Sequence, residues 1–304
     1  MAAVTAAMVK ELRESTGAGM MECKKALTET DGDMEAAVDV LRKSGAAKVE
    51  KKAGRIAAEG ITRVASEGNT AVVVEVNSET DFVAKNATFQ EFVQAVADKA
   101  LKASVDKAGD GEDVCAILDM QSELEEKTLT IGEKLSIRRF QKITGDCVAS
   151  YIHGGGRIGV LVAADGASND AIKEALTNVA MQIAALKPQY TSDSEVSAEY
   201  IEHEKEILLA QIQNDPKESQ KPEKVIQGMI TGRIKKELKE ICLLDQVYVK
   251  AEDGKQTVAK YVEEVAKANG AKITIKGFVR YETGDGIEKK EENFAEEVAK
   301  QMNA

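Results

Sequence analysis

Apolar side chains recur at helical spacing through the first part of the chain. Three amphipathic segments are separated by the turn-forming stretches 16–19 and 30–33, and apolar positions three or four residues apart indicate helices. The third segment begins after Asp33, whose carboxylate is a common helix cap, and the pair Ser44-Gly45 is expected to end it. Because such a small unit buries little surface by itself, this part is interpreted as a three-helix docking module.

Two later parts of the chain share one pattern, in which two strands are followed by an amphipathic helix. Runs of β-branched residues bounded by turn signals predict the strands, and the shared order suggests an internal duplication. The expected strand, strand and helix are 56–66, 70–76 and 86–101 in the first part, and 147–152, 158–163 and 169–186 in the second. Between the two parts, the expected elements are a helix over 114–127 and an edge strand over 135–143. The sequence therefore predicts a two-part α/β core with antiparallel sheets.

Two long amphipathic helices interrupt the second half of this core. They flank the turn NDPKESQKP, which holds two of the three prolines, and apolar seams on both arms predict an antiparallel coiled-coil hairpin. The core pattern then resumes with an expected strand over 246–250, a helix over 256–269, a strand over 271–281 and a final helix over 294–302. The predicted fold class is α+β, and the predicted divisions are 1–54, 55–144, 145–192 with 242–285, 193–241 for the hairpin, and 286–304 for a C-terminal helical module.

The stretch 72–85 combines a buried strand with a polar loop. Its first residues are β-branched, whereas the run 77–81 favours turns and caps, so the strand is expected to end at Val76. Phe82 follows directly, in a chain that is 4% aromatic and lacks tryptophan. Two interpretations stay open on this pattern: Phe82 packs as a staple under the next helix, or it is an exposed contact residue.

The charge balance argues against a broad nucleic-acid surface. The 41 basic and 52 acidic residues give a formal charge of −11, and an acidic chain repels phosphate backbones. A short basic cluster is the exception, and it is interpreted either as the solvated face of a linker helix or as a contact to an acidic partner. This cluster consists of Lys48, Lys51, Lys52 and Arg55.

Cysteine usage and the terminal pattern predict a cytoplasmic location. The four cysteines form no CxxC pair, and free thiols fit a reducing cytoplasm. The first residues lack a basic segment followed by an apolar core, so no signal peptide is expected. The sequence has no run of about 18 apolar residues, so no membrane span is expected. We therefore expect a protein that contacts neither membranes nor nucleic acid directly.

Catalytic motifs are missing from the sequence. The chain has no GxxxxGK phosphate loop, and HGGGR at 153–157 lies between two predicted strands, which favours a hairpin turn. His153 stands six residues after Cys147 on a strand, a spacing with no geometric reason to bring the two side chains together. With two histidines in the chain, no zinc-site spacing occurs. The sequence thus predicts no enzyme, no cofactor and no metal, and favours a protein that acts by binding.

Two segments carry a resemblance to a known family. LRESTGAGMMECKKAL at 12–27 and EVNSETDFVAK at 75–85 resemble the two signature stretches of bacterial translation elongation factor Ts. The order of the parts is similar to that family from end to end, with a helical module, a two-part core, an inserted hairpin and a C-terminal helix. The resemblance implies that the N-terminal module has a ubiquitin-associated-like fold.

The resemblance also implies a function. The family promotes GDP release from elongation factor Tu, which it binds in GDP-bound and nucleotide-free forms, through a Thr-Asp-Phe loop that wedges in near the magnesium and phosphate site. Carried onto this chain, the implied contact residues are Thr80, Asp81 and Phe82 in the loop, with Lys24, Ile131, Gly132 and His153 elsewhere. A homodimer through the hairpin is a further expectation. The competing hypothesis is a non-catalytic scaffold that binds the GTPase without changing nucleotide exchange.

Overall fold

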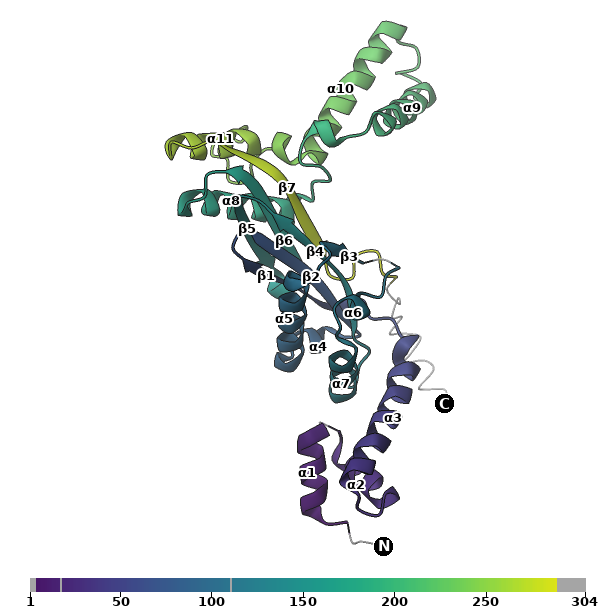
Figure 1. Cartoon of the computed structure of the whole chain (residues 1–304). Coiled ribbons are helices and arrows are strands. Elements are labelled where there is room, and N and C mark those ends of the chain that lie inside the picture. The colour runs from purple at the N-terminus through teal and green to yellow at the C-terminus, as the bar shows by residue number, and fades with distance from the viewer. Residues whose placement is uncertain (1–3, 17, 110, 289–304) are drawn as a thin grey trace.

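The computed structural model describes residues 4–16, 18–109 and 111–288. Figure 1 shows an elongated molecule whose parts follow one another along its length. Three N-terminal helices form one end, two sheets with their covering helices form the centre, and a helical hairpin projects from the other end. Because the described elements combine helices with two antiparallel sheets, the predicted α+β class is confirmed.

The N-terminal helices are α1 (Ala6–Thr16), α2 (Met20–Glu29) and α3 (Met34–Ala53). Their apolar faces meet in a small core of their own, which includes Leu12, Cys23 and Leu27. As expected, Asp33 caps α3, accepting a hydrogen bond from the Ala36 N–H at 3.0 Å.

The predicted end of the third helix at Ser44-Gly45 is wrong. Helix α3 continues through both residues to Ala53. Gly45 is buried against α7 (Gln121–Ile131), where an added β-carbon would stand 2.7 Å from Leu129 Cδ1. The glycine therefore permits close helix packing, and this tertiary contact outweighs the roughly 1 kcal/mol that glycine costs inside a helix.

The first sheet has the strand order β1-β2-β4-β3. Its strands are β1 (Glu59–Glu67), β2 (Thr70–Ser78), β3 (Lys107–Ala108) and β4 (Ser136–Thr144). The strand expected at the edge is β4, and that edge position is wrong, because β4 lies between β2 and the short strand β3, which pairs with it at Lys107 and Ala108. Helix α5 (Ala87–Lys102) covers one face, and α6 (Val114–Ile117) and α7 replace the single helix expected over 114–127. Asp119 breaks that helix with a left-handed φ of 51°.

Strand β2 is longer than predicted. Asn77 and Ser78 stay in the ladder opposite Gly60 and Glu59, and both are buried. The Asn77 amide donates to the Glu59 carbonyl at 3.1 Å, so its polar side chain has a partner inside the sheet. Hydrogen bonding of the buried polar groups thus allows two turn-favouring residues to extend an apolar strand.

The second sheet has the order β5-β6-β7. It consists of β5 (Cys147–His153), β6 (Ile158–Gly166) and β7 (Ile273–Glu282), covered by α8 (Asp170–Leu186) and then α11 (Val258–Ala268). A strand hairpin followed by a helix therefore occurs in both halves, as the sequence predicts. In each half a third strand joins the second strand of the hairpin antiparallel, with a register shift in that central strand.

The strand expected over 246–250 is not formed. That region follows a short 3₁₀ turn (Leu243–Asp245) and makes one isolated bridge, between Val247 and Thr257. The buried Gln182 side chain instead donates to the Val247 carbonyl at 3.0 Å and accepts from the Val249 N–H at 2.8 Å. One side-chain amide thus satisfies the backbone groups that a neighbouring strand would otherwise engage.

The two sheets pack against each other at the centre of the molecule. On β2, Val72 and Val74 belong to the core shared with α5, whereas Val73 meets Leu161 of β6 and Tyr281 of β7. The core therefore has four layers, with helices outside and the sheets inside. Since both faces of β2 are buried, its continuous apolar run is explained.

The hairpin consists of α9 (Ala198–Asn214) and α10 (Glu223–Ile241). Ile212, Ile230 and Ile234 are buried along the seam between the two arms. The expected final helix over 294–302 lies outside the described residues. Within the described ranges, none of the helices is both long enough and apolar enough to cross a membrane.

Candidate functional site

The polar loop after β2 forms a one-turn helix, α4 (Asp81–Ala84). Thr80 is its N-cap, and the Thr80 hydroxyl accepts the Val83 N–H at 3.4 Å. Asn86 then caps α5 by accepting the Thr88 and Phe89 N–H groups at 2.8 and 3.3 Å. Two capping residues six positions apart therefore fix a compact turn between the strand and the long helix.

Phe82 projects from this turn into solvent. Its side chain is 80% exposed, the highest value among the large hydrophobic side chains of the described ranges. Its neighbour Val83 is 8% exposed and packs in the core of the first sheet. The staple interpretation is therefore wrong for Phe82, and Val83 provides the anchor instead.

Asp81 stands beside Phe82 and carries an ion pair on its own helical turn. The Lys85 ammonium donates to Asp81 Oδ2 at 2.7 Å and holds the pKa of that carboxyl below its usual value. Lys85 Nζ also lies 6.0 Å from the centre of the Phe82 ring. Because both charged groups are exposed, the pair contributes little to stability and its carboxylate is accessible to another molecule.

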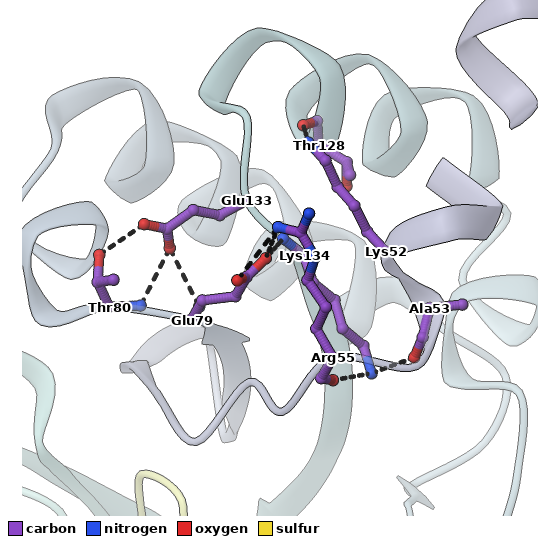
Figure 2. Close-up of polar contacts among 8 residues, drawn as sticks. All are labelled: Lys52, Ala53, Arg55, Glu79, Thr80, Thr128, Glu133 and Lys134. Atoms are coloured by element: carbon purple, nitrogen blue, oxygen red, sulfur yellow. Dashed lines mark hydrogen bonds and ion pairs between the residues drawn. The ribbon is translucent and has the colours of Figure 1, made fainter. Parts of the chain in front are cut away.

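Glu133 holds the loop in place (Figure 2). Its Oε2 accepts the Glu79 and Thr80 N–H groups at 3.1 and 3.0 Å, and its Oε1 accepts the Thr80 hydroxyl at 2.6 Å. Charge-assisted hydrogen bonds of this kind are about twice as strong as neutral ones. The Glu133 carboxylate therefore pins the turn that presents Asp81 and Phe82.

The candidate residues Ile131 and Gly132 lie next to this contact. Helix α7 ends at Ile131, and Gly132 follows with a left-handed φ of 87°. Ile131 packs against the core of the first sheet, while Gly132 is exposed. The left-handed turn directs the chain so that Glu133 reaches Thr80, which brings five of the seven candidate residues into one area.

A buried carboxylate supports the base of the loop. Glu75 is fully buried at the register shift of β2, between Arg138 Nη1 at 3.1 Å and Arg139 Nε at 2.6 Å. The Gly284 N–H and the Asn77 amide also donate to Glu75 Oε1, at 2.8 and 3.1 Å. Since a buried charge is costly without partners, this complete set of donors rigidifies the strand that carries the loop.

His153 occupies a different turn. It ends β5, is exposed, and its Nδ1 lies 3.0 Å from the Tyr151 hydroxyl. The HGGGR segment is a hairpin turn as predicted, and Arg157 in it lies 3.9 Å from Glu59, the residue paired with Ser78 before the loop. The two turns therefore lie at the same end of the β1–β2 hairpin.

Cys147 lies at the opposite end of β5 from His153. A rise of about 3.3 Å per residue separates the two by about 20 Å. Cys147 is also buried, and its register partner is Ala164, whereas His153 pairs with Ile158. A thiol–imidazole pair is therefore excluded by the geometry of the strand.

Lys24 lies apart from the other candidates, on helix α2. It is exposed, one helical turn from Met20 and Met21, which are 56% and 76% exposed. The N-terminal helices reach the core mainly through α3 and α7. Lys24 therefore belongs to a second exposed surface rather than to the surface around Phe82.

Three residues of this region are missed by the sequence analysis: Glu79, Glu133 and Lys134. Glu133 contacts Thr80 across 53 positions of the chain, and no short-range pattern marks such a pair. The available signal is weak, because an acidic residue after Gly132 is equally compatible with a solvated turn. Only the fold places it under the loop.

A rigidly held, exposed Asp-Phe turn and separate projecting helices define a protein that acts by contacting another macromolecule. Residues 79–285 match the family model described as elongation factor TS. The chain is 52% identical over 314 residues to elongation factor Ts of Clostridioides difficile (strain 630), which covers 99% of this chain and 100% of the relative. It is 51% identical over 304 residues to elongation factor Ts of Clostridium perfringens (strain 13 / Type A), with 98% of each covered. The chain belongs to the elongation factor Ts family and is a factor of translation elongation.

Proposed function

We propose that the chain is a guanine-nucleotide exchange factor for elongation factor Tu, and that its 80–82 loop promotes GDP release. The observation that carries this proposal is the exposed Phe82 on a turn whose backbone is held by Glu133 and Val83. Single exposed apolar side chains are common on protein surfaces, so the proposal depends on the combination of an 80% exposed aromatic ring with a fixed turn beneath it. Rigid presentation also lowers the entropy lost on binding.

The energetic requirement is modest. An exchange factor and GDP lower each other's affinity for the GTPase by the same factor, because binding is reciprocal. Each tenfold loosening of GDP needs about 1.4 kcal/mol of differential contact. Burying one phenylalanine supplies roughly 1.5–3 kcal/mol, so Phe82 accounts for a substantial part of the effect.

Asp81 has a complementary role in this proposal. Its carboxylate, now paired with Lys85, enters near the magnesium and phosphate site of the GTPase beside the Phe82 wedge. Two actions are open to it there: it pulls on the ligands of the metal, or it hydrogen-bonds a displaced helix. Both actions require the exposed, charged form of the carboxyl, whose pKa the Lys85 ion pair lowers further.

The other parts of the chain are assigned by the same proposal. Residues 1–54 dock on the partner through a surface that contains Lys24, and the core divisions 55–144 and 145–192 with 242–285 carry the loop and His153. Residues 193–241 form a separable hairpin that can pair two copies of the chain. The C-terminal module, 286–304, lies mostly outside the described ranges.

Replacing Phe82 tests the proposal directly. Phe82→Ala removes an exposed side chain, so the fold is retained, and we expect GDP release from elongation factor Tu to slow about tenfold or more at equal factor concentration. Stopped-flow release of a fluorescent GDP measures this rate. Ile117→Ala is the matched control, since Ile117 is another exposed apolar side chain of the same subdomain, and it leaves the rate unchanged.

The same measurement distinguishes the exchange-factor proposal from the scaffold hypothesis. A chain that binds elongation factor Tu but leaves the GDP release rate at its spontaneous value is a scaffold, and the exchange proposal is then wrong. An unchanged rate for Phe82→Ala in an active factor rejects only the wedge role of the loop.

A further inference from the structure

The N-terminal helices and the 80–82 loop are linked by one polar cluster, which Figure 2 shows. We call it the module–loop junction, and it consists of Ala53, Arg55, Glu79, Thr80, Glu133 and Lys134. Lys134 Nζ donates to the carbonyls of Ala53 and Arg55 at 2.7 and 2.8 Å. Ala53 is the last residue of α3 and Arg55 follows the C-cap, and at such a helix end the last backbone acceptors have no helical partner and a cation is favourable.

The backbone of Lys134 makes the next link. Its N–H donates to Glu79 Oε1 at 2.5 Å, and the same carboxylate lies 3.2 Å from Arg55 Nη1. Glu79 is the first residue after β2 and is largely shielded from solvent, with 21% of its side chain exposed. The end of α3 and the end of β2 are therefore held together by two oppositely charged residues.

The preceding residue, Glu133, completes the link to the loop. It contributes the three hydrogen bonds to Glu79 and Thr80 described above. Glu133 and Lys134 are consecutive, so one short segment after Gly132 holds the loop with its acidic side chain and α3 with its basic side chain. A movement of α3 is thus transmitted to the residues that present Phe82.

Apart from this junction, the main contact between the N-terminal helices and the core is a single pair of helices. It runs along α3 and α7, where Lys52 Nζ lies 3.4 Å from the Thr128 carbonyl and Gly45 packs near Leu129. The connection from Ala53 to β1 contains no helix or strand. A single helix pair permits pivoting, whereas the module–loop junction adds a second point of attachment at the end of α3.

We infer that Lys134, Glu79 and Glu133 are positioning residues that set the orientation of the N-terminal module relative to the 80–82 loop. Two binding surfaces held at a fixed geometry engage a partner with a high effective concentration for the second contact. The junction therefore strengthens binding of the GTPase without touching its nucleotide. The inference rests on the proposed function, because it assumes that both surfaces meet the same partner.

The decisive variant is Lys134→Met, which removes the ammonium but keeps the backbone N–H that binds Glu79. We measure GDP release from elongation factor Tu at increasing concentrations of the factor. The half-saturating concentration rises about tenfold, while the maximal release rate stays within about twofold, because Phe82 is intact. If Lys134→Met only reduced the fraction of folded protein, the half-saturating concentration would return to the wild-type value once factor concentrations were corrected for the folded fraction.

Lys142→Met is the matched control. Lys142 Nζ donates to the Ala103 carbonyl at the C-cap of α5, so it has the same chemistry within the core and away from the junction. Its half-saturating concentration stays at the wild-type value. Glu79→Gln is the second junction variant, since it retains an acceptor for the Lys134 N–H while losing the charge, and it shifts the same quantity by a smaller factor.

Orientation is measured without the partner. Spin labels at Glu35→Cys on α3 and Lys99→Cys on α5, in a Cys115→Ala background, report the distance between module and core. Lys134→Met broadens this distance distribution, and Lys142→Met does not. If both the distribution and the half-saturating concentration match the wild type, the junction is not a positioning device. If the wild-type chain fails to accelerate GDP release, the proposed function is wrong, while the distance measurement still decides the role of the junction.

Discussion

Glu282 joins three separate parts of the core through one side chain and its carbonyl. Its carboxylate accepts from Lys187 Nζ at 2.7 Å and from Arg280 Nη2 at 2.9 Å, and its carbonyl accepts from Arg139 at 3.2 Å. The hydrogen bond from Lys187, followed by that from Arg280, lowers the pKa of Glu282 to about 2 from the usual 4.5. This single residue therefore couples protonation to the stability of the second sheet.

The sign of the pH dependence follows from that lowered pKa. A carboxyl with a depressed folded-state pKa stabilises the fold above its unfolded pKa, here near 4.5, and the contribution is lost as the pH falls towards about 2. Glu282→Gln is therefore less stable than the wild type at pH 7, and the difference closes by about pH 2. Urea unfolding at several pH values measures this. Asp165→Asn, which alters an exposed ion pair 3.7 Å long, leaves stability unchanged within about 0.5 kcal/mol at each pH.

At the scale of elements, α4 is too short to be stable by itself. Four helical residues supply almost no hydrogen bonds of their own, and isolated short helices are marginal in water. Its order comes from the Thr80 cap, the Glu133 carboxylate and the buried Val83 side chain. The order of the turn that presents Phe82 therefore depends on these three contacts and not on the helix itself.

Thr80→Val tests that dependence. The change removes both the cap and the bond to Glu133, at a cost of about 1 kcal/mol or more, so amide hydrogen exchange in residues 81–85 speeds up and GDP release slows. Thr257→Val is the matched control, because Thr257 caps α11 by accepting the Lys260 N–H at 3.3 Å. A similar loss of global stability with unchanged GDP release is expected there. Equal effects of the two variants on GDP release would show that the loop needs no local order.

At the scale of the whole molecule, the hairpin is attached at a single narrow base. Tyr190 and Cys242 form a bridge where its two connections leave the core, and the N–H groups of Gln189 and Tyr190 bond to the Ile241 carbonyl at 2.8 and 3.2 Å. The apolar seam packs between its own arms. The hairpin can therefore be removed without exposing the sheets.

Deletion of residues 195–240 with a short glycine linker is expected to leave GDP release within about twofold of the wild type. The physical reason is that the loop and Glu133, which holds it, lie in the other half of the core. Analytical ultracentrifugation of the wild type and of the deletion variant measures whether the hairpin pairs two copies of the chain, as proposed. A collapse of exchange in a deletion variant that remains folded would place the hairpin in the active surface.

Much of the fold was predictable because local patterns decide it. The caps Asp33 and Asn169 mark helix starts, and the apolar runs 71–74 and 158–163 mark buried strands. Each of these signals acts between residues close in the chain. The wrong predictions, a helix end at Gly45 and a strand over 246–250, depend on distant contacts instead. Gly45 packs against Leu129, and Gln182 bonds to the Val247 carbonyl.

The sequence by itself determined the class of protein, the α+β elements and the stretch 75–85 as the place to look. It left Phe82 undecided between staple and contact, because apolar character is the same in both cases. Only the tertiary structure decided this, by burying Val83 and leaving Phe82 exposed. It alone also revealed Glu133 and Lys134, because a bond across 53 or more positions depends on how the chain folds back, which no local pattern encodes.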